Sequence, residues 1–178
     1  MLIKIALVAL FAALTAAGTF IAIPVGPVPI VLQNLFALLA GLVLGPFMGG
    51  AAVGLYLLAG ILNFPVFAGG TGGIARFAGP SGGFLIGYFL AAVTGGLVAG
   101  QPGGSRTPLP RLIAAVAAGL LVAYVPGVFW LKFSRNLSWA KAFLAGFIPF
   151  IPGDIIKGIA AVVIVPRLRR IAADLLNE

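Results

Sequence analysis

The sequence contains no cysteine and no histidine among its 178 residues. Disulfide bonds are therefore excluded, the usual thiolate and imidazole ligands of zinc are absent, and a catalytic Ser-His pair cannot form. Aspartate and glutamate total three in the whole chain, and the one carboxylate expected to be buried, Asp154, cannot by itself supply a metal cluster or an acid/base pair. The phosphate-binding pattern GxxxxGK followed by Ser or Thr does not occur either. We therefore expect a protein that is not an enzyme, holds no metal or cofactor, and does not hydrolyse ATP by itself.

Charge of either sign is rare in this chain. Charged residues make up 8% of the sequence and hydrophobic residues 62%, whereas soluble domains have about 25% charged residues. This composition is that of an integral membrane protein. The net charge of +8 does not indicate a nucleic-acid binder, because the basic residues are scattered and no polar face carries them. We interpret this charge as a signal of membrane topology.

Apolar runs separated by turn signals predict an all-α protein with six transmembrane helices in one domain, residues 1–178. Three prolines in PVGPVP end the first span, and Gly45 with Pro46 separates the second from the third. The region before the fifth span is a polar linker, and the region after it is expected to be part loop and part short amphipathic helix. The expected spans cover residues 3–23, 30–44, 47–62, 84–99, 112–131 and 153–165.

The first span also has the features of a secretory signal peptide, with a charge at Lys4, an apolar core and small residues at its end. Five hydrophobic spans follow it, so a retained helix is the preferred interpretation. Six spans place both termini on one side of the membrane. The basic residues on that side are Lys4, Arg106, Arg111, Arg167, Arg169 and Arg170, and those on the other side are Arg76, Lys132, Arg135 and Lys141. The positive-inside rule therefore predicts that both termini are cytoplasmic.

Polar residues gather at the predicted outer ends of the spans. Gln33 and Asn34 lie near the start of the second span, and Asp154 and Lys157 lie near the start of the sixth. Because Asp154 and Lys157 are three residues apart, they share one face of a helix. This pair is either a structural ion pair near the membrane interface or part of a binding site for a polar solute. If the second and sixth helices converge, all four side chains line one cavity.

A glycine-rich loop, residues 63–83, joins the third and fourth spans on the same outer side and includes Gly70, Gly72 and Arg76. Glycine allows a close approach of the backbone to a ligand, although glycine-rich segments are more often flexible connectors. Phenylalanines such as Phe67 are interleaved with the glycines. These apolar side chains favour a loop that packs down as a lid.

The first span carries small residues at every fourth position, Ala9, Ala13 and Ala17. Small residues at this spacing make a flat helix face that another helix can approach closely. The pattern alone does not distinguish a partner helix within the chain from one in another protein.

Three blocks of sequence resemble the BioY family in order and spacing: PVGPVPIVLQNLFALLAGLVLGP, FPVFAGGTGG with FAGPSGGFLIGY, and FIPFIPGDIIKG. The resemblance implies a biotin-specific substrate-capture subunit, or S component, of an energy-coupling factor (ECF) transporter in a prokaryotic cell membrane. It further implies a bundle of six helices that binds biotin from outside. The implied partners are membrane lipid, a transmembrane coupling subunit that docks on the Ala9, Ala13 and Ala17 face, and two ABC-type ATPases.

If the ligand is biotin, its chemistry suggests roles for the polar residues. Asp154 would accept a hydrogen bond from a ureido N–H, Asn34 or Gln33 would donate to the ureido oxygen, and Arg76 or Lys157 would meet the carboxylate. The remaining expected ligand contacts, to the rings and tail or through the loop backbone, are Phe36, Tyr56, Phe67, Tyr88, Gly70 and Gly72. Two alternatives stay open at this point, an S component for another vitamin and a membrane channel or scaffold.

Overall fold

The computed structural model describes residues 1–24, 27–103 and 107–177. Arg106, used above for the topology, and residues 25–26 of the PVGPVP segment lie outside the described part. The long helices are α1 (Leu2–Ala17), α2 (Gln33–Ile61), α4 (Gly82–Ala99), α5 (Leu109–Ser134) and α7 (Ile151–Asn177). The shorter elements are the strands β1 (Ala22–Ile23) and β2 (Ile30–Val31), the helices α3 (Ile74–Phe77) and α6 (Trp139–Gly146), and the 3-10 helix η1 (Ile148–Phe150).

Helix α2 is two helices joined by a sharp turn. Gly45 has φ +83° and ψ 176°, a backbone conformation that is almost restricted to glycine, and Pro46 follows it. The second half then folds back on the first, since a Cβ added to Gly49 would lie 2.4 Å from the Cα of Gly41. Gly45 and Pro46 therefore separate two spans, as the sequence predicted.

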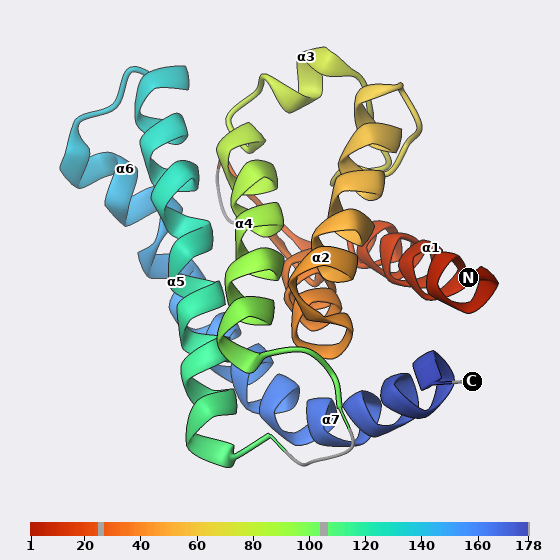
Figure 1. Cartoon of the computed structure of the whole chain (residues 1–178). Coiled ribbons are helices and arrows are strands. Elements are labelled where there is room, and N and C mark those ends of the chain that lie inside the picture. The colour runs from red at the N-terminus through yellow and green to blue at the C-terminus, as the bar shows by residue number, and fades with distance from the viewer. Residues whose placement is uncertain (25–26, 104–106, 178) are drawn as a thin grey trace.

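The described residues contain four helices that are long and apolar enough to cross a membrane, α2, α4, α5 and the α6–α7 segment, and the shorter apolar helix α1. With α2 counted as two, the six predicted spans are all present within the described residues. The helices form one bundle in which α3 and α6 lie at one end, the upper end in Figure 1, and the α4–α5 connection lies at the opposite end. Both termini point to the same flank, and α1 contacts α7.

Most boundaries lie within about three residues of the prediction, and two differ by more. Helix α1 ends at Ala17 instead of residue 23, and the chain then forms the antiparallel pair β1–β2, in which Ala22 faces Val31. The Thr19 hydroxyl donates to the Ala16 carbonyl at 2.6 Å, so it occupies a carbonyl at the helix end. Helix α7 continues through Pro166 to Asn177 instead of ending at residue 165.

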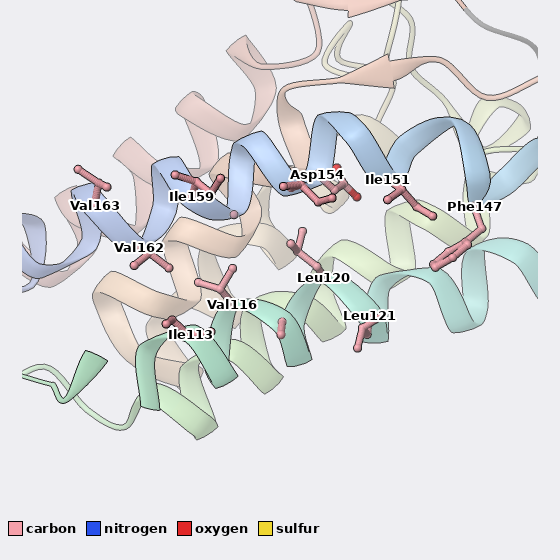
Figure 2. A pocket seen from close by; sticks show the side chains of 13 residues that line it. Ile113, Val116, Leu120, Leu121, Phe147, Ile151, Asp154, Ile159, Val162 and Val163 are labelled. Carbon is pink, nitrogen blue, oxygen red and sulfur yellow. The ribbon is translucent and has the colours of Figure 1, made fainter. Parts of the chain in front are cut away.

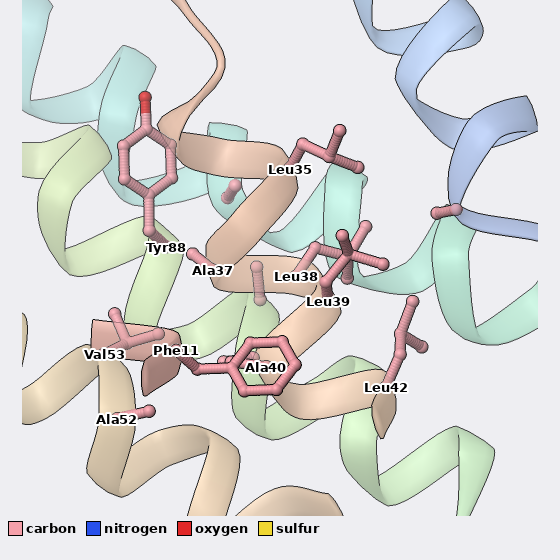
Figure 3. Close-up of a cluster of buried hydrophobic side chains, with 14 of the residues drawn as sticks. Phe11, Leu35, Ala37, Leu38, Leu39, Ala40, Leu42, Ala52, Val53 and Tyr88 are labelled. Atoms are coloured by element: carbon pink, nitrogen blue, oxygen red, sulfur yellow. The ribbon is translucent and has the colours of Figure 1, made fainter. Parts of the chain in front are cut away.

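The core of the bundle is centred on α2, whose buried side chains pack with those of α1 and α4 (Figure 3), and it continues through α4 to α5. Small residues allow these helices to touch at the backbone. A Cβ added to Gly87 of α4 would lie 2.3 Å from the carbonyl oxygen of Ala123 in α5, and one on Gly41 of α2 would lie 1.9 Å from that of Ala92 in α4. Because lipid is as apolar as the side chains, such close packing is a main source of helix association in membranes.

Candidate functional site

Three side chains from opposite parts of the chain form one hydrogen-bonded cluster at the end of the bundle that carries α3 and α6. Lys157 of α7 lies 3.1 Å from Oδ1 of Asp154, and the Nδ2 of Asn34 in α2 donates to the same oxygen at 3.0 Å. Lys157 also donates to Oδ1 of Asn34 at 2.8 Å and to the carbonyl of Val31 in β2 at 2.9 Å. The ends of α2 and α7 therefore converge, as the sequence analysis supposed.

A fourth member of the cluster was missed by the sequence analysis. The hydroxyl of Tyr124 in α5 donates to Oδ2 of Asp154. Asp154 and Lys157 are 6% and 7% exposed, so the ion pair is buried and each partner depends on the other. The sequence contains three tyrosines, and Tyr56 and Tyr88, predicted for the site, lie near it as well. Tyr124 could have been selected from the sequence, because a tyrosine hydroxyl buried inside an apolar span needs a hydrogen-bond partner.

Gln33 points away from this cluster, although it is adjacent to Asn34. Its Nε2 donates to the hydroxyl of Tyr56 at 2.7 Å, and the Tyr56 ring meets the edge of Phe67, with ring centroids 5.7 Å apart. Gln33 is 1% exposed, Tyr56 and Phe67 2%. This second cluster links the start of α2, the second half of α2 and the glycine-rich loop.

Two small cavities lie between the clusters, and both are lined by Tyr88 of α4. One is also lined by Gln33 and Phe67, and the other by Asn34 and Asp154. Each has a volume of about 20 Å³, which is enough for one water molecule. Tyr88 (Figure 3) is therefore in contact with both cavities. Phe84 and Phe150, which the sequence analysis did not select, stack at 6.0 Å and line the Asp154 side.

Of the predicted loop residues, Phe67 lines one of these cavities, whereas Gly70, Gly72 and Arg76 line neither. Gly70 has φ +66°, so it uses the conformational freedom expected of this loop, and a Cβ on Gly72 would lie 2.3 Å from the Phe64 carbonyl oxygen. Arg76 in α3 is exposed and donates to the Ala68 carbonyl at 3.4 Å. Phe67 anchors the loop, since its backbone pairs with Thr71 and its ring is buried. The loop is therefore packed down on the bundle, as a lid would be.

A larger apolar groove runs along the outside of the bundle between α5 and α7 (Figure 2). Its volume is about 590 Å³, and it is lined by aliphatic side chains such as Val116, Leu120 and Ile159, with Asp154 between Ile159 and Ile151. The groove brings an apolar surface up to the buried ion pair. A surface of this composition suits contact with the hydrocarbon chains of lipid.

The small-residue face of α1 is free within the described chain. Ala9, Ala13 and Ala17 are exposed, whereas Phe11 and Ala12 on the opposite face are buried against the bundle. One face of α1 therefore packs on the bundle, and the other is accessible.

No group of three or more His, Cys, Asp or Glu residues that could hold a metal ion occurs in the described part of the chain.

The chain is similar to known proteins over most of its length. A family model described as the BioY family matches residues 2–174. A probable biotin transporter BioY of Pyrococcus horikoshii is 43% identical over 166 residues, which is 93% of this chain and 96% of that protein. The biotin transporter BioY of Thermotoga maritima is 39% identical over 165 residues, 93% of this chain and 95% of that protein.

Two solved structures share the fold. The crystal structure of an S-component for biotin from an ECF-type ABC transporter superposes with a TM-score of 0.82 at 34% identity, covering 94% of this chain and 90% of that one. The structure of FolT bound with folic acid superposes with a TM-score of 0.60 at 21% identity, covering 92% and 89% of the two chains. The second likeness is one of fold alone.

Proposed function

Because the chain belongs to the BioY family, we propose that it is the biotin-binding S component of an ECF transporter. It captures biotin at the outer side of the membrane and delivers it to the cytoplasm when coupled to an energising module. The observation that carries this proposal is the buried cluster of Asn34, Asp154, Lys157 and Tyr124 beside the cavities around Tyr88. Biotin is the transported ligand, and no cofactor is required.

The ureido ring of biotin has two N–H donors and one carbonyl, and it fits the hydrogen-bonding positions that this cluster leaves unused. A carboxylate has about four acceptor positions, and Asp154 uses three of them, two on Oδ1 and one on Oδ2. The remaining position on Oδ2 would accept one ureido N–H. Asn34 donates one of its two amide hydrogens to Asp154, so the other would reach the ureido oxygen. Gln33 has the same capacity on the far side of Tyr88.

The carboxylate of biotin would meet Arg76 in preference to Lys157. Lys157 has three N–H donors, and Val31, Asn34 and Asp154 accept one each. Arg76 makes one long hydrogen bond and is otherwise exposed, so its guanidinium is free to bind a carboxylate through two N–H groups. Lys157 then holds Asp154 and Asn34 in position.

A two-ring ligand is larger than either cavity, so its binding requires the two cavities to join. Movement of Tyr88, or of the loop that Phe67 anchors, would connect them. Phe36 is half-buried and packs against the core, while Gly70 and Gly72 would allow the loop backbone to close over the ligand. Tyr56, Phe67 and Tyr88 would supply the apolar contacts to the thiophane ring and the tail.

The partners proposed for transport are a transmembrane coupling subunit, two ABC-type ATPases and the surrounding lipid. The ATPases account for an S component that has no phosphate-binding loop of its own. The exposed face of Ala9, Ala13 and Ala17 supports docking of the coupling subunit on α1, because helices with small residues approach closely. Both termini would lie in the cytoplasm of a prokaryotic cell.

The test of this function is a calorimetric and thermal-stability titration of the purified protein with biotin, using thiamine and riboflavin as controls. We expect saturable binding and stabilisation by biotin alone. Binding of biotin alone would favour this proposal over an S component for another vitamin, and over a channel or scaffold. Absence of stabilisation by biotin would reject it.

A further inference from the structure

A second polar site lies at the end of the bundle opposite Asp154. There the end of α4, the start of α5 and the later part of α7 surround a cavity of about 240 Å³. Its lining includes Gly100, Gln101, Thr107 and two arginines, Arg111 of α5 and Arg169 of α7. None of these residues belongs to the biotin site, and the cavity lies on the side that the topology assigns to the cytoplasm.

Arg169 is held in this cavity by the ends of two other helices. It is 7% exposed; its Nη1 donates to the Leu42 carbonyl at 2.6 Å and its Nη2 to the Gln101 carbonyl at 2.7 Å. Carbonyl dipoles at helix ends stabilise a cation, but they leave its full positive charge in place. The charge of Arg169 is therefore fixed in position without being neutralised.

Arg111 places a second guanidinium at the same cavity. Its Nε donates to the Val98 carbonyl at 2.7 Å, and its two Nη atoms have no hydrogen-bond partner among the described residues. Within that part of the chain, the only ion pair is Asp154 with Lys157, so neither arginine has a carboxylate within 4.0 Å. Residues 104–106 of the adjoining linker are Gly, Ser and Arg, and they contribute no acid.

Two unneutralised guanidiniums at one polar cavity form a site for an anion. The start of α5 adds to this potential, because Pro108 offers no side-chain cap and the first turn has no acidic residue. Arginine binds phosphate oxygens through two parallel N–H groups, and a phosphate group has enough oxygens to meet two arginines. Basic pockets between transmembrane helices on the cytoplasmic side suit the headgroups of anionic lipids.

We propose that this cavity binds a phosphate group through Arg111 and Arg169. The group is carried either by the headgroup of an anionic lipid or by a small soluble phosphate compound. Its binding would clamp α5 and α7 together at the cytoplasmic end. Arg169 fixes the geometry of the site, and Arg111, with its free Nη groups, supplies most of the hydrogen bonds.

The full-length protein in a neutral detergent is titrated with dihexanoyl phosphatidylglycerol, glycerol 3-phosphate and inorganic phosphate, with binding followed by calorimetry and thermal unfolding. The test variant is Arg111→Gln. The matched control is Arg170→Gln, which removes the same charge from an exposed position of α7. Retained biotin binding in both variants shows that they are folded, because Arg111 lies at the opposite end from the biotin site.

We expect saturable binding of at least one phosphate compound, weakened by salt, with about a tenfold loss in Arg111→Gln and less than a twofold change in Arg170→Gln. Binding of the lipid alone identifies a lipid site, and binding of the water-soluble compounds as well identifies a soluble ligand. The proposal is overturned if no compound binds saturably, or if the two variants lose affinity equally. Either result leaves the proposed biotin binding unaffected.

Discussion

At the scale of single residues, Asp154 is the acceptor around which the outer cluster is built. We expect Asp154→Asn to weaken biotin binding by more than tenfold, because the change removes a charged, buried hydrogen-bond acceptor. Calorimetric titration measures this loss, and thermal unfolding checks that the variant is folded. Asp174→Asn is the matched control, since it changes the same group at an exposed position. Unchanged affinity in Asp154→Asn would remove Asp154 from the site.

The roles of Arg76 and Lys157 separate when the charge of the ligand is removed. Arg76→Gln should weaken binding of biotin about tenfold, but it should have little effect on binding of biotin amide, which has no carboxylate. Lys157→Gln should weaken both ligands to a similar extent, because it disturbs Asp154 and Asn34. Arg135→Gln, another exposed basic residue on the outer side, serves as the control. Equal losses for both ligands in Arg76→Gln would contradict the assignment.

At the scale of helices, packing of α4 against α5 depends on the absence of side chains. Gly87→Ala would place a methyl group 2.3 Å from a backbone oxygen, and the resulting shift should cost about 1–3 kcal/mol of stability. Gly54→Ala is the matched control, because its Cβ would meet only Phe89 at 3.7 Å. Thermal unfolding in detergent compares the two. A Gly87 variant as stable as the Gly54 variant would mean that the helices can move apart at little cost.

The two faces of α1 should respond differently to substitution. Ala13 is exposed and Ala12 is buried. We expect Ala13→Leu to leave biotin binding unchanged and to reduce transport in cells that contain the complete ECF module, because a bulky residue blocks close approach of the coupling subunit. Ala12→Leu should instead lower the stability of the isolated protein. Loss of biotin binding in purified Ala13→Leu would indicate that this face packs within the subunit.

At the scale of the whole molecule, the absence of cysteine makes the orientation directly testable. Single cysteines are introduced at Ser134, near the end of α5, and at Thr107, in the linker at the opposite end of the bundle. We expect a membrane-impermeant maleimide added to intact cells to label Ser134→Cys and to label Thr107→Cys only after permeabilisation. The reverse pattern would place the termini outside, and the cluster around Asp154 on the cytoplasmic side.

The membrane-spanning character and the six spans could be predicted from the sequence, because both depend on the local composition of each segment. The turn at Gly45 and Pro46 was predicted correctly, because glycine and proline determine the backbone conformation at their own positions. The predicted end of α7 at residue 165 was wrong, because the helix continues through Pro166 to Asn177. On this continuation Arg169 donates to the carbonyls of Leu42 and Gln101, which are distant in the sequence. Propensity rules do not include such contacts.

Which polar groups meet follows from the way the helices pack, and it could not be predicted from the sequence. Asn34 and Asp154 are separated by 120 positions and form a hydrogen bond, whereas the adjacent Gln33 turns to Tyr56. Tyr124 joins Asp154 from α5. Its place in an apolar span indicated that its hydroxyl needs a partner, but not which partner. Arg111 and Arg169 likewise reach one cavity from different helices. Hydropathy reports how one segment partitions into lipid. The partner of a buried polar atom depends instead on how whole helices cross, and that is set by packing across the bundle.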